Sequence, residues 1–268
     1  REEKVYEAIF EETELSALVE KIKQAKRLAI DTETDSPSPV RAHLVGLSFS
    51  LEPGKAYYLP LGHDYQGVPR QITKPRALRL LAEALEHPEI KKSGQNIKYD
   101  LIVLRREGIA MRGIDLDSMV LSYLLEPNWG KHSLDKLALS YLQLKPIAYN
   151  EVAGKGKNEV TLNKVSIERV APYACQDADL SLELTAQLWP KVQERKLDKL
   201  YRELEQPLIQ VLADIETRGI KVDRAALEAL AEEFAQELAR LEKKIYELSG
   251  EEFNINSPQQ LARILFHK

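Results

Sequence analysis

The sequence predicts an α/β fold followed by a separate helical segment, and three observations support this prediction. Residues 27–34, 43–51 and 55–61 are short, apolar and rich in β-branched or aromatic side chains, which is typical of strands. Amphipathic helical patterns follow at residues 76–88 and 96–108. From about residue 197 the chain becomes rich in Leu, Glu, Ala and Lys, which indicates a second, all-helical module.

Turn and cap residues mark the ends of these elements. The dipeptide Pro53-Gly54 predicts the turn between the second and third strands. Pro88 follows the first helical pattern, and Gly108 is suited to cap the end of the second. The buried faces of the two helices are predicted to be formed by Leu78, Leu81, Ala82 and Leu85, and by Ile97, Leu101 and Leu104.

The second module is predicted to contain three helices. Apolar residues at intervals of three or four predict helices over 204–215 and 227–248, and Gly219 separates them. A third helix is expected to begin after Ser257, with Gln260 completing a capping box. We therefore expect two domains, residues 1–196 and 197–268. Because the third helix stops barely two turns later, we also expect the chain to be a fragment of a longer protein.

Composition narrows the class of protein. The chain has 268 residues, 44% of them hydrophobic, and a net charge of −4, which is typical of globular proteins. It has no uninterrupted apolar stretch of membrane-spanning length, and its first residues lack the layout of a signal peptide. The single Cys175 excludes a disulfide framework and a multi-cysteine zinc site. We expect a cytoplasmic protein.

Two carboxylates stand at the end of the first strand. Asp31 and Glu33 follow the apolar residues 28–30, and side chains two apart on a strand point to the same face. Like charges so close repel, so a cation between them would stabilise the pair. Carboxylate oxygens without His or Cys nearby favour Mg²⁺ or Mn²⁺ over zinc. Taken alone, the pair fits an exposed acidic loop equally well.

Two further segments place acids on helical patterns. Asp100 interrupts an otherwise apolar run, and Asn96 lies one turn before it on the same side. In "YACQDADL", Tyr173 and Asp177 are four residues apart and share one helical face. A tyrosine there can position a water while the aspartate holds a metal. Taken alone, each segment also fits a structural tyrosine or a solvent-exposed acid.

Taken together, these segments resemble the three motifs of the tyrosine-bearing branch of the DEDD exonuclease superfamily. "DTETD", "GQNIKYD" and the Tyr-Asp pair of "YACQD" occur in the family's order. "LVGLSFSLEPG", "SLDKLALSYL", "EVAGKGKN" and "GEEFNINSPQQLARILF" are similar to successive stretches of the bacterial DNA polymerase I family (family A). The resemblance implies a ribonuclease H-like mixed sheet flanked by helices, then the beginning of a polymerase thumb.

The resemblance also implies a catalytic set. It makes Asp31, Glu33, Asp100 and Asp177 the metal-binding carboxylates, with Tyr173 orienting the attacking water. Two divalent cations, Mg²⁺ or Mn²⁺, held about 4 Å apart can activate water and stabilise the leaving 3′ oxygen of a phosphodiester. Because a free tyrosine has a pKa near about 10, we expect Tyr173 to position the water rather than act as a full base.

Substrate contacts are implied around this set. Aromatic faces stack on any base, and polar or basic side chains follow phosphates without reading sequence. By resemblance, the residues along a single-stranded 3′ end are Gln95, Asn96, Tyr99, Lys131 and Tyr149. Two positions depart from the family pattern, since Pro37 stands where leucine is frequent and Lys131 where arginine is frequent. These departures concern the grip on the terminal nucleotide and leave metal binding untouched.

We therefore expect a two-metal 3′→5′ exonuclease acting on single-stranded or frayed DNA 3′ ends, the proofreading part of a DNA polymerase I. Its partners would be the DNA end and the palm and fingers of a longer parent chain. The resemblance also implies a monomer in the bacterial cytoplasm, associated with the nucleoid. A catalytically silent DNA-holding scaffold and an RNA-trimming DEDD exonuclease are the alternatives. The four retained acids argue against the first, and the thumb-like residues 204–223 against the second. No palm carboxylates are present, so we expect no DNA synthesis by this chain alone.

Overall fold

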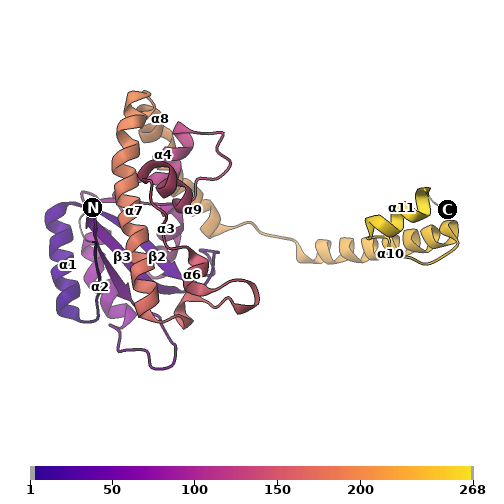
Figure 1. Cartoon of the computed structure of the whole chain (residues 1–268), viewed down its shortest axis with the longest axis horizontal. Coiled ribbons are helices and arrows are strands. Elements are labelled where there is room, and N and C mark those ends of the chain that lie inside the picture. The colour runs from indigo at the N-terminus through magenta and orange to yellow at the C-terminus, as the bar shows by residue number, and fades with distance from the viewer. Residues whose placement is uncertain (1–3, 267–268) are drawn as a thin grey trace. The chain divides into compact units, whose positions relative to one another are not determined.

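A six-stranded mixed sheet forms the centre of the structure, a computed structural model that describes residues 4–266 (Figure 1). The strand order is β1-β4-β3-β2-β5-β6. Strand β3 is antiparallel to both β2 and β4, and the remaining pairs are parallel. The strands are β1 (Val5–Ala8), β2 (Arg27–Thr34), β3 (Leu44–Glu52), β4 (Lys55–Pro60), β5 (Lys91–Gly94) and β6 (Ile114–Asp117). The predicted α/β class is confirmed.

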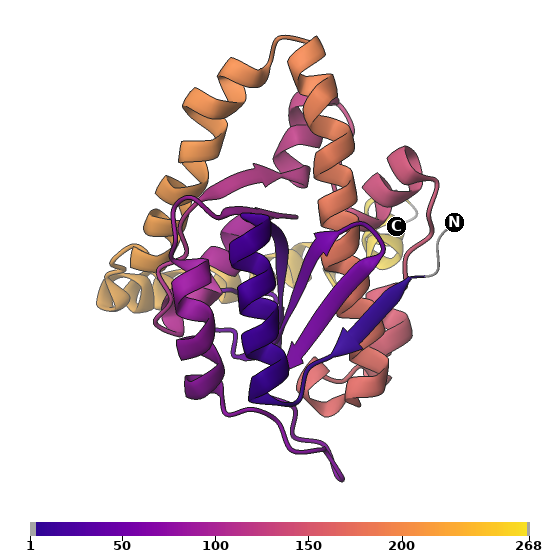
Figure 2. The same ribbon diagram turned by 90° about the vertical axis from the view of Figure 1, so that its left-hand side faces the viewer.

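Helices cover both faces of the sheet. Figure 2 shows α1 (Glu12–Ala25) and α2 (Lys74–Leu85) in front of the strands, whereas the long α7 (Ile167–Glu194) crosses behind them. The cores are correspondingly separate: α1, α2 and α3 (Ile97–Arg106) pack on one face, and α7 packs on the other. Strands that are covered on both faces favour apolar side chains on both, which explains the buried run at residues 28–30.

The remaining helices connect these layers or extend beyond them. Helix α4 (Ser118–Leu125) packs against α7 and forms a third apolar cluster with it. The others are α5 (Leu134–Leu137), η1 (Ala138–Leu142), α6 (Tyr149–Ala153), η2 (Gly156–Asn158), η3 (Leu162–Lys164), α8 (Asp198–Leu200), η4 (Tyr201–Glu205), α9 (Gln206–Arg218), α10 (Arg224–Ser249) and α11 (Pro258–Phe266). None of the helices described is long and apolar enough to cross a membrane.

The chain divides into two compact units, Arg1–Arg218 and Gly219–Lys268. The sequence places the domain boundary earlier, after residue 196. The difference arises because α9 packs into the first unit, where Ile209 and Ala213 are buried in the core beside α3. Ion pairs from Lys98 to Glu216 and from Arg105 to Asp214 also join α3 to α9. Long-range packing of this kind leaves no local signal at the boundary.

The second unit contains the long helix and the third helix that the sequence predicts. Helix α10 begins at an Asp223 side chain that accepts a hydrogen bond from the Ala226 N–H, and Gly250 ends it at a φ of 73°. Gln260 accepts from the Asn254 N–H at 2.9 Å, while the Ser257 N–H donates to the Asn254 carbonyl. Of the predicted capping box, the Ser257 hydroxyl accepts from the Gln260 N–H at 3.4 Å, whereas the Gln260 side chain accepts from Asn254 instead of from the Ser257 N–H.

Candidate active site

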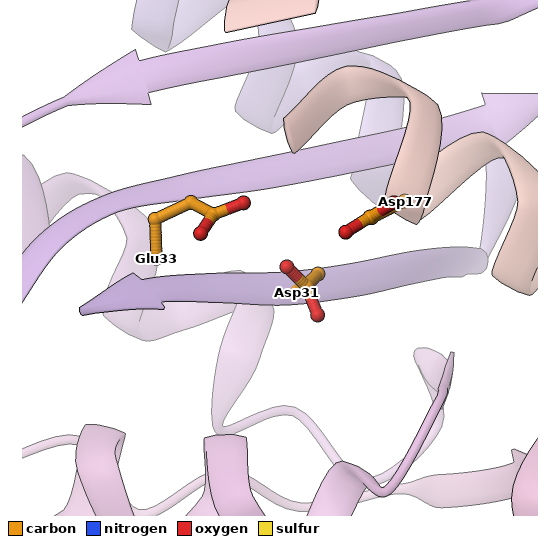
Figure 3. Close-up of side chains that lie close together, drawn as sticks. All are labelled: Asp31, Glu33 and Asp177. Atoms are coloured by element: carbon orange, nitrogen blue, oxygen red, sulfur yellow. The ribbon is translucent and has the colours of Figure 1, made fainter. Parts of the chain in front are cut away.

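Three carboxylates converge on the face of the sheet that α7 covers (Figure 3). Asp31 and Glu33 come from the end of β2, and Asp177 comes from α7. One oxygen of each lies within 4.8 Å of the others. Strand alternation places Asp31 and Glu33 on one face, and α7 crosses that face with Asp177 directed at them. We call these three residues the acidic cluster.

Asp100 lies next to the acidic cluster but is held from another direction. It is buried on α3, and its Oδ1 accepts hydrogen bonds from the Thr32 N–H at 2.8 Å and the Thr32 hydroxyl at 2.6 Å. Burial and the negative charge of Asp31 raise the pKa of Asp100. Asp100 thus feels the charge of the cluster while Thr32 holds one of its oxygens.

Burial and mutual repulsion dominate the electrostatics of the site. Burial is the main cause that raises the pKa of Asp31 and Glu33, and the neighbouring carboxylates add to it. Burial also raises the pKa of Asp177 to about 8, although a hydrogen bond from Tyr173 acts in the opposite direction. Each shift disfavours a bare carboxylate, so the group is stabilised either by protons or by a cation.

The acidic cluster fits a hard divalent cation. Glu33 Oε1 is buried and has no hydrogen-bond partner among the described residues, a costly arrangement unless a ligand completes it. Carboxylate oxygens are the donors that Mg²⁺ and Mn²⁺ favour. The nearby His63 is engaged elsewhere, with Nε2 2.8 Å from the Tyr58 hydroxyl and Nδ1 3.0 Å from the Val165 carbonyl oxygen. Asp31, Glu33 and Asp177 are therefore residues that could hold a metal.

Tyr173 lies one helical turn before Asp177 and donates a hydrogen bond to its carboxylate. Burial and the charges of Asp177, Glu33 and Asp31 raise the pKa of Tyr173 above its ordinary value. The phenol therefore stays neutral and keeps its proton as a hydrogen-bond donor. This state suits the positioning of a polar ligand rather than the removal of a proton.

A cavity of about 700 Å³ opens beside the acidic cluster. Its lining includes Glu33 and Tyr173, together with the predicted substrate residues Tyr99 and Tyr149 and the divergent Pro37. The Tyr99 hydroxyl lies 2.5 Å from Thr34 Oγ1 and donates to the Ser36 carbonyl, also at 2.5 Å. Tyr99 thereby ties the loop after β2 to α3, whereas Tyr149 is 42% exposed.

The other three predicted substrate residues do not line this cavity. The Gln95 amide donates to the His132 carbonyl at 2.7 Å, and its oxygen accepts from the Ser118 hydroxyl at 2.5 Å. Asn96 precedes α3 with a φ of 57°. Lys131 is exposed in the connection between α4 and α5. Gln95 is thus held by protein groups, and Lys131 stands free to reach a ligand.

Two residues near the site were not among the predicted site residues, although Thr32 stands inside the motif "DTETD". Thr32 holds Asp100, and strand alternation could have placed it on the face opposite Asp31 and Glu33. Asp135 contributes a negative charge that raises the pKa of Asp177. It lies in the short helix α5, 42 positions before Asp177, and no local pattern brings the two together.

Comparison with known proteins identifies the family. The family model described as 3′-5′ exonuclease matches residues 6–193, and the model of DNA polymerase family A matches residues 224–268. DNA polymerase I of Pseudomonas aeruginosa is 39% identical over 266 residues, covering 98% of this chain and 29% of its own length. DNA polymerase I of Rhizobium leguminosarum is 43% identical over 258 residues, covering 90% and 25%.

The chain thus spans less than a third of the length of these curated relatives. Among solved structures, the POL domain of Pol1 from M. smegmatis in complex with DNA primer-template and dNTP has the same fold. The TM-score is 0.75 at 23% identity, covering 97% of this chain and 40% of that one. With its exonuclease model matched across most of its length, the chain belongs to the 3′-5′ exonuclease family of bacterial family A DNA polymerases.

Proposed function

We propose that this chain is a two-metal-dependent 3′→5′ exonuclease that hydrolyses phosphodiester bonds at single-stranded or frayed DNA 3′ ends. The observation that carries the proposal is the acidic cluster, with three carboxylate oxygens within 4.8 Å and the unpartnered Oε1 of Glu33. The curated relatives are DNA polymerases, so the expected context is proofreading within a longer chain in the bacterial cytoplasm, at the nucleoid. The palm and fingers of that chain would be its partners.

The proposed division of labour follows from charge and burial. Asp31, Glu33 and Asp177 hold the cations, and Asp100 completes the set from α3. The chemistry supplied by bound divalent cations is the acidification of a water and the stabilisation of the leaving 3′ oxygen. Tyr173 stays protonated and donates a hydrogen bond that orients the reacting groups. No general base is required of the tyrosine.

The cavity beside the acidic cluster is the proposed site of the 3′-terminal nucleotide. Tyr149 offers an exposed aromatic face for stacking on any base, and Tyr99 holds the wall that contains Pro37. Lys131 is placed to contact a phosphate of the DNA backbone. Gln95 and Asn96, just before α3, would lie along the DNA strand. A site of this composition accepts any base.

The decisive assay compares wild type with the double variant Asp31→Ala, Glu33→Ala on a 3′-labelled single-stranded DNA oligonucleotide with Mg²⁺. Wild type is expected to release mononucleotides and the double variant to release none. The matched control is Asp64→Ala, an exposed acid paired with Lys164. A wild type that releases nothing, or a double variant as active as wild type, would overturn the proposal.

Two further measurements test the substrate and the metal. Matched DNA and RNA oligonucleotides are offered in competition, and a strong preference for RNA would contradict the assignment to DNA. Calorimetric titration with Mn²⁺ is expected to show binding that the double variant loses. Wild type without cation binding would leave only a scaffold role.

A further inference from the structure

A buried carboxylate outside the acidic cluster holds the helix that carries Asp100. Asp117 ends β6 and is 1% exposed. Its Oδ1 accepts hydrogen bonds from the N–H groups of Met119 at 2.8 Å, Val120 at 3.2 Å and Asn96 at 3.2 Å. Its Oδ2 accepts from the Ile97 N–H at 2.8 Å. One carboxylate therefore caps the beginnings of both α3 and α4.

The turn that enters α3 depends on this capping. Asn96 has a φ of 57°, a left-handed conformation that costs a non-glycine residue free energy unless its surroundings fix it. Its N–H and that of Ile97 both point at Asp117. The Ser118 hydroxyl, next to Asp117, lies 2.5 Å from Gln95 Oε1 and 3.1 Å from the Gly94 carbonyl oxygen. The end of β6 thus holds the whole turn from Gly94 to Ile97.

Asp100 is close to the capped end of α3. It lies three residues after Ile97, in the first turn of the helix, so any displacement of the capped end moves its carboxylate as well. At its other side, Asp100 must still meet Thr32 at 2.6 Å and 2.8 Å. Asp100 therefore keeps its place beside Asp31 only if the beginning of α3 and Thr32 on β2 both stay in position.

Tyr201 supports Asp117 from behind. It is fully buried, and its hydroxyl accepts from the Asp117 N–H at 2.9 Å and donates to the Asp115 carbonyl at 3.1 Å. Tyr201 lies in η4, beyond residues 6–193 that match the exonuclease family model. The position of the β6 end therefore depends on a segment outside the matched region.

We propose that Asp117 is a positioning residue of the exonuclease and that Tyr201 supports it. Its carboxylate fixes the turn into α3. It thereby positions Asp100 beside Asp31, and it positions Gln95 and Asn96 beside a bound DNA strand. It contacts neither metal nor substrate and acts through α3. The inference rests on the proposed function, because the aligned residues matter only if they serve hydrolysis.

The variant Asp117→Asn tests the positioning role without changing volume. A carboxylate accepts at both oxygens, whereas an amide accepts at one and donates from its nitrogen. If the amide oxygen stays with Met119 and Val120, the NH₂ group faces the Ile97 N–H, donor against donor. The cap of α3 is then lost while the cap of α4 remains. The matched control is Asp115→Asn, two residues earlier on the same strand, where the side chain pairs with Arg202.

Two readouts separate positioning from mere stability. Calorimetric titration with Mn²⁺ is expected to show about 10- to 100-fold weaker binding to Asp117→Asn than to wild type, as for other residues that orient metal ligands. On a single-stranded oligonucleotide, kcat is expected to fall and KM to rise, with kcat recovering in part at high Mn²⁺. Tyr201→Phe is expected to shift the same quantities in the same direction by about two- to tenfold. Asp115→Asn is expected to behave as wild type.

An Asp117→Asn protein that melts earlier yet keeps wild-type Mn²⁺ affinity, kcat and KM would make Asp117 merely structural and overturn the inference. If Asp117→Asn does not fold, Tyr201→Phe decides by the same readouts. The proposed function fails separately, through a wild type that binds Mn²⁺ but releases no nucleotide. In that case the Mn²⁺ affinities of wild type and variants still decide whether Asp117 positions Asp100.

Discussion

Asp177 carries the clearest pH signature of the site. Its pKa is raised from 3.8 to about 8 in the folded, metal-free protein, mainly by burial. The folded state therefore binds this proton more tightly than the unfolded state, and the associated stability is complete below about pH 4. That stability is lost as the pH rises towards 8.

We therefore expect wild type in EDTA to lose stability relative to Asp177→Asn as the pH rises from 5 to 8. The comparison is made between thermal unfolding curves of the two proteins, so that titrating groups outside the site cancel. Mn²⁺ is expected to raise the Tm of wild type most at the alkaline end, where the carboxylates are free of protons. A difference in Tm between the two proteins that does not change with pH would contradict this assignment.

The hydroxyl of Tyr173 supplies a second prediction. Since its raised pKa keeps it protonated, Tyr173→Phe removes a hydrogen-bond donor and no charge. We expect kcat to fall by about 10²-fold, within the range for the loss of one preorganised hydrogen-bond donor, while Mn²⁺ affinity stays within a few-fold of wild type. Tyr123→Phe is the control, because that tyrosine is exposed and is not among the residues that line the cavity. Equal kcat for Tyr173→Phe and wild type would exclude this role.

A glycine on β3, Gly46, lies opposite Glu33 of the acidic cluster on β2. Gly46 pairs with Glu33, and a Cβ at residue 46 would lie 2.2 Å from the Tyr58 hydroxyl and 2.5 Å from its ring. Tyr58 is fully buried, and its hydroxyl is hydrogen-bonded to His63 Nε2 at 2.8 Å, so its ring has no free space to move into. The pairing that holds Glu33 thus leaves no room for a side chain at residue 46.

Gly46→Ala is accordingly expected to cost about 1–3 kcal/mol of unfolding free energy and to reduce nuclease activity by displacing Glu33. Urea unfolding and the oligonucleotide assay provide the two measurements. Ser48→Ala, at the next position on the same face of β3, is the control. Its hydroxyl is buried without a partner among the described residues, so its removal is expected to be neutral or stabilising. If Gly46→Ala is as stable as wild type, the Tyr58 side chain can move to make room for the added methyl group.

Elements whose pattern is local were predictable from the sequence. Strand alternation placed Asp31 and Glu33 on one face, and helical spacing placed Tyr173 one turn before Asp177. Contacts between residues that are distant in the chain could not be predicted from the sequence. The capping of α3 by Asp117, the contact of Thr32 with Asp100 and the charge of Asp135 near Asp177 all depend on how strands and helices pack. No periodicity encodes such contacts.

At the scale of the whole molecule, the domain boundary predicted after residue 196 does not coincide with the division between the two compact units. Composition changes near residue 197, yet the first compact unit continues to Arg218. Apolar spacing predicted the helix over 204–215 correctly but could not say what it packs against. Ile209 and Ala213 supply that answer, because they are buried in the core of the first unit.

Shortened chains test this division. A chain ending at residue 218 is expected to unfold at the same temperature as the full chain and to keep its Mn²⁺ affinity. A chain ending at residue 196 loses Tyr201 and Ile209, at about 1.5–3 kcal/mol for each buried side chain, and is expected to unfold at a lower temperature. Thermal and denaturant unfolding of the three lengths provide the measurement. Equal stability of the chains ending at 196 and 218 would restore the earlier boundary.

The ion pairs between α3 and α9 have a mechanical consequence. Helix α9 is the last element of the first unit, so tension on the chain beyond residue 218 enters that unit through it. The ion pairs from Lys98 to Glu216 and from Arg105 to Asp214 would transmit this tension to α3, the helix that carries Asp100. Because these pairs are only partly buried, added salt weakens them. Added salt is thus expected to loosen the charged part of the contact between α9 and α3, while the buried Ile209 and Ala213 keep α9 in the core.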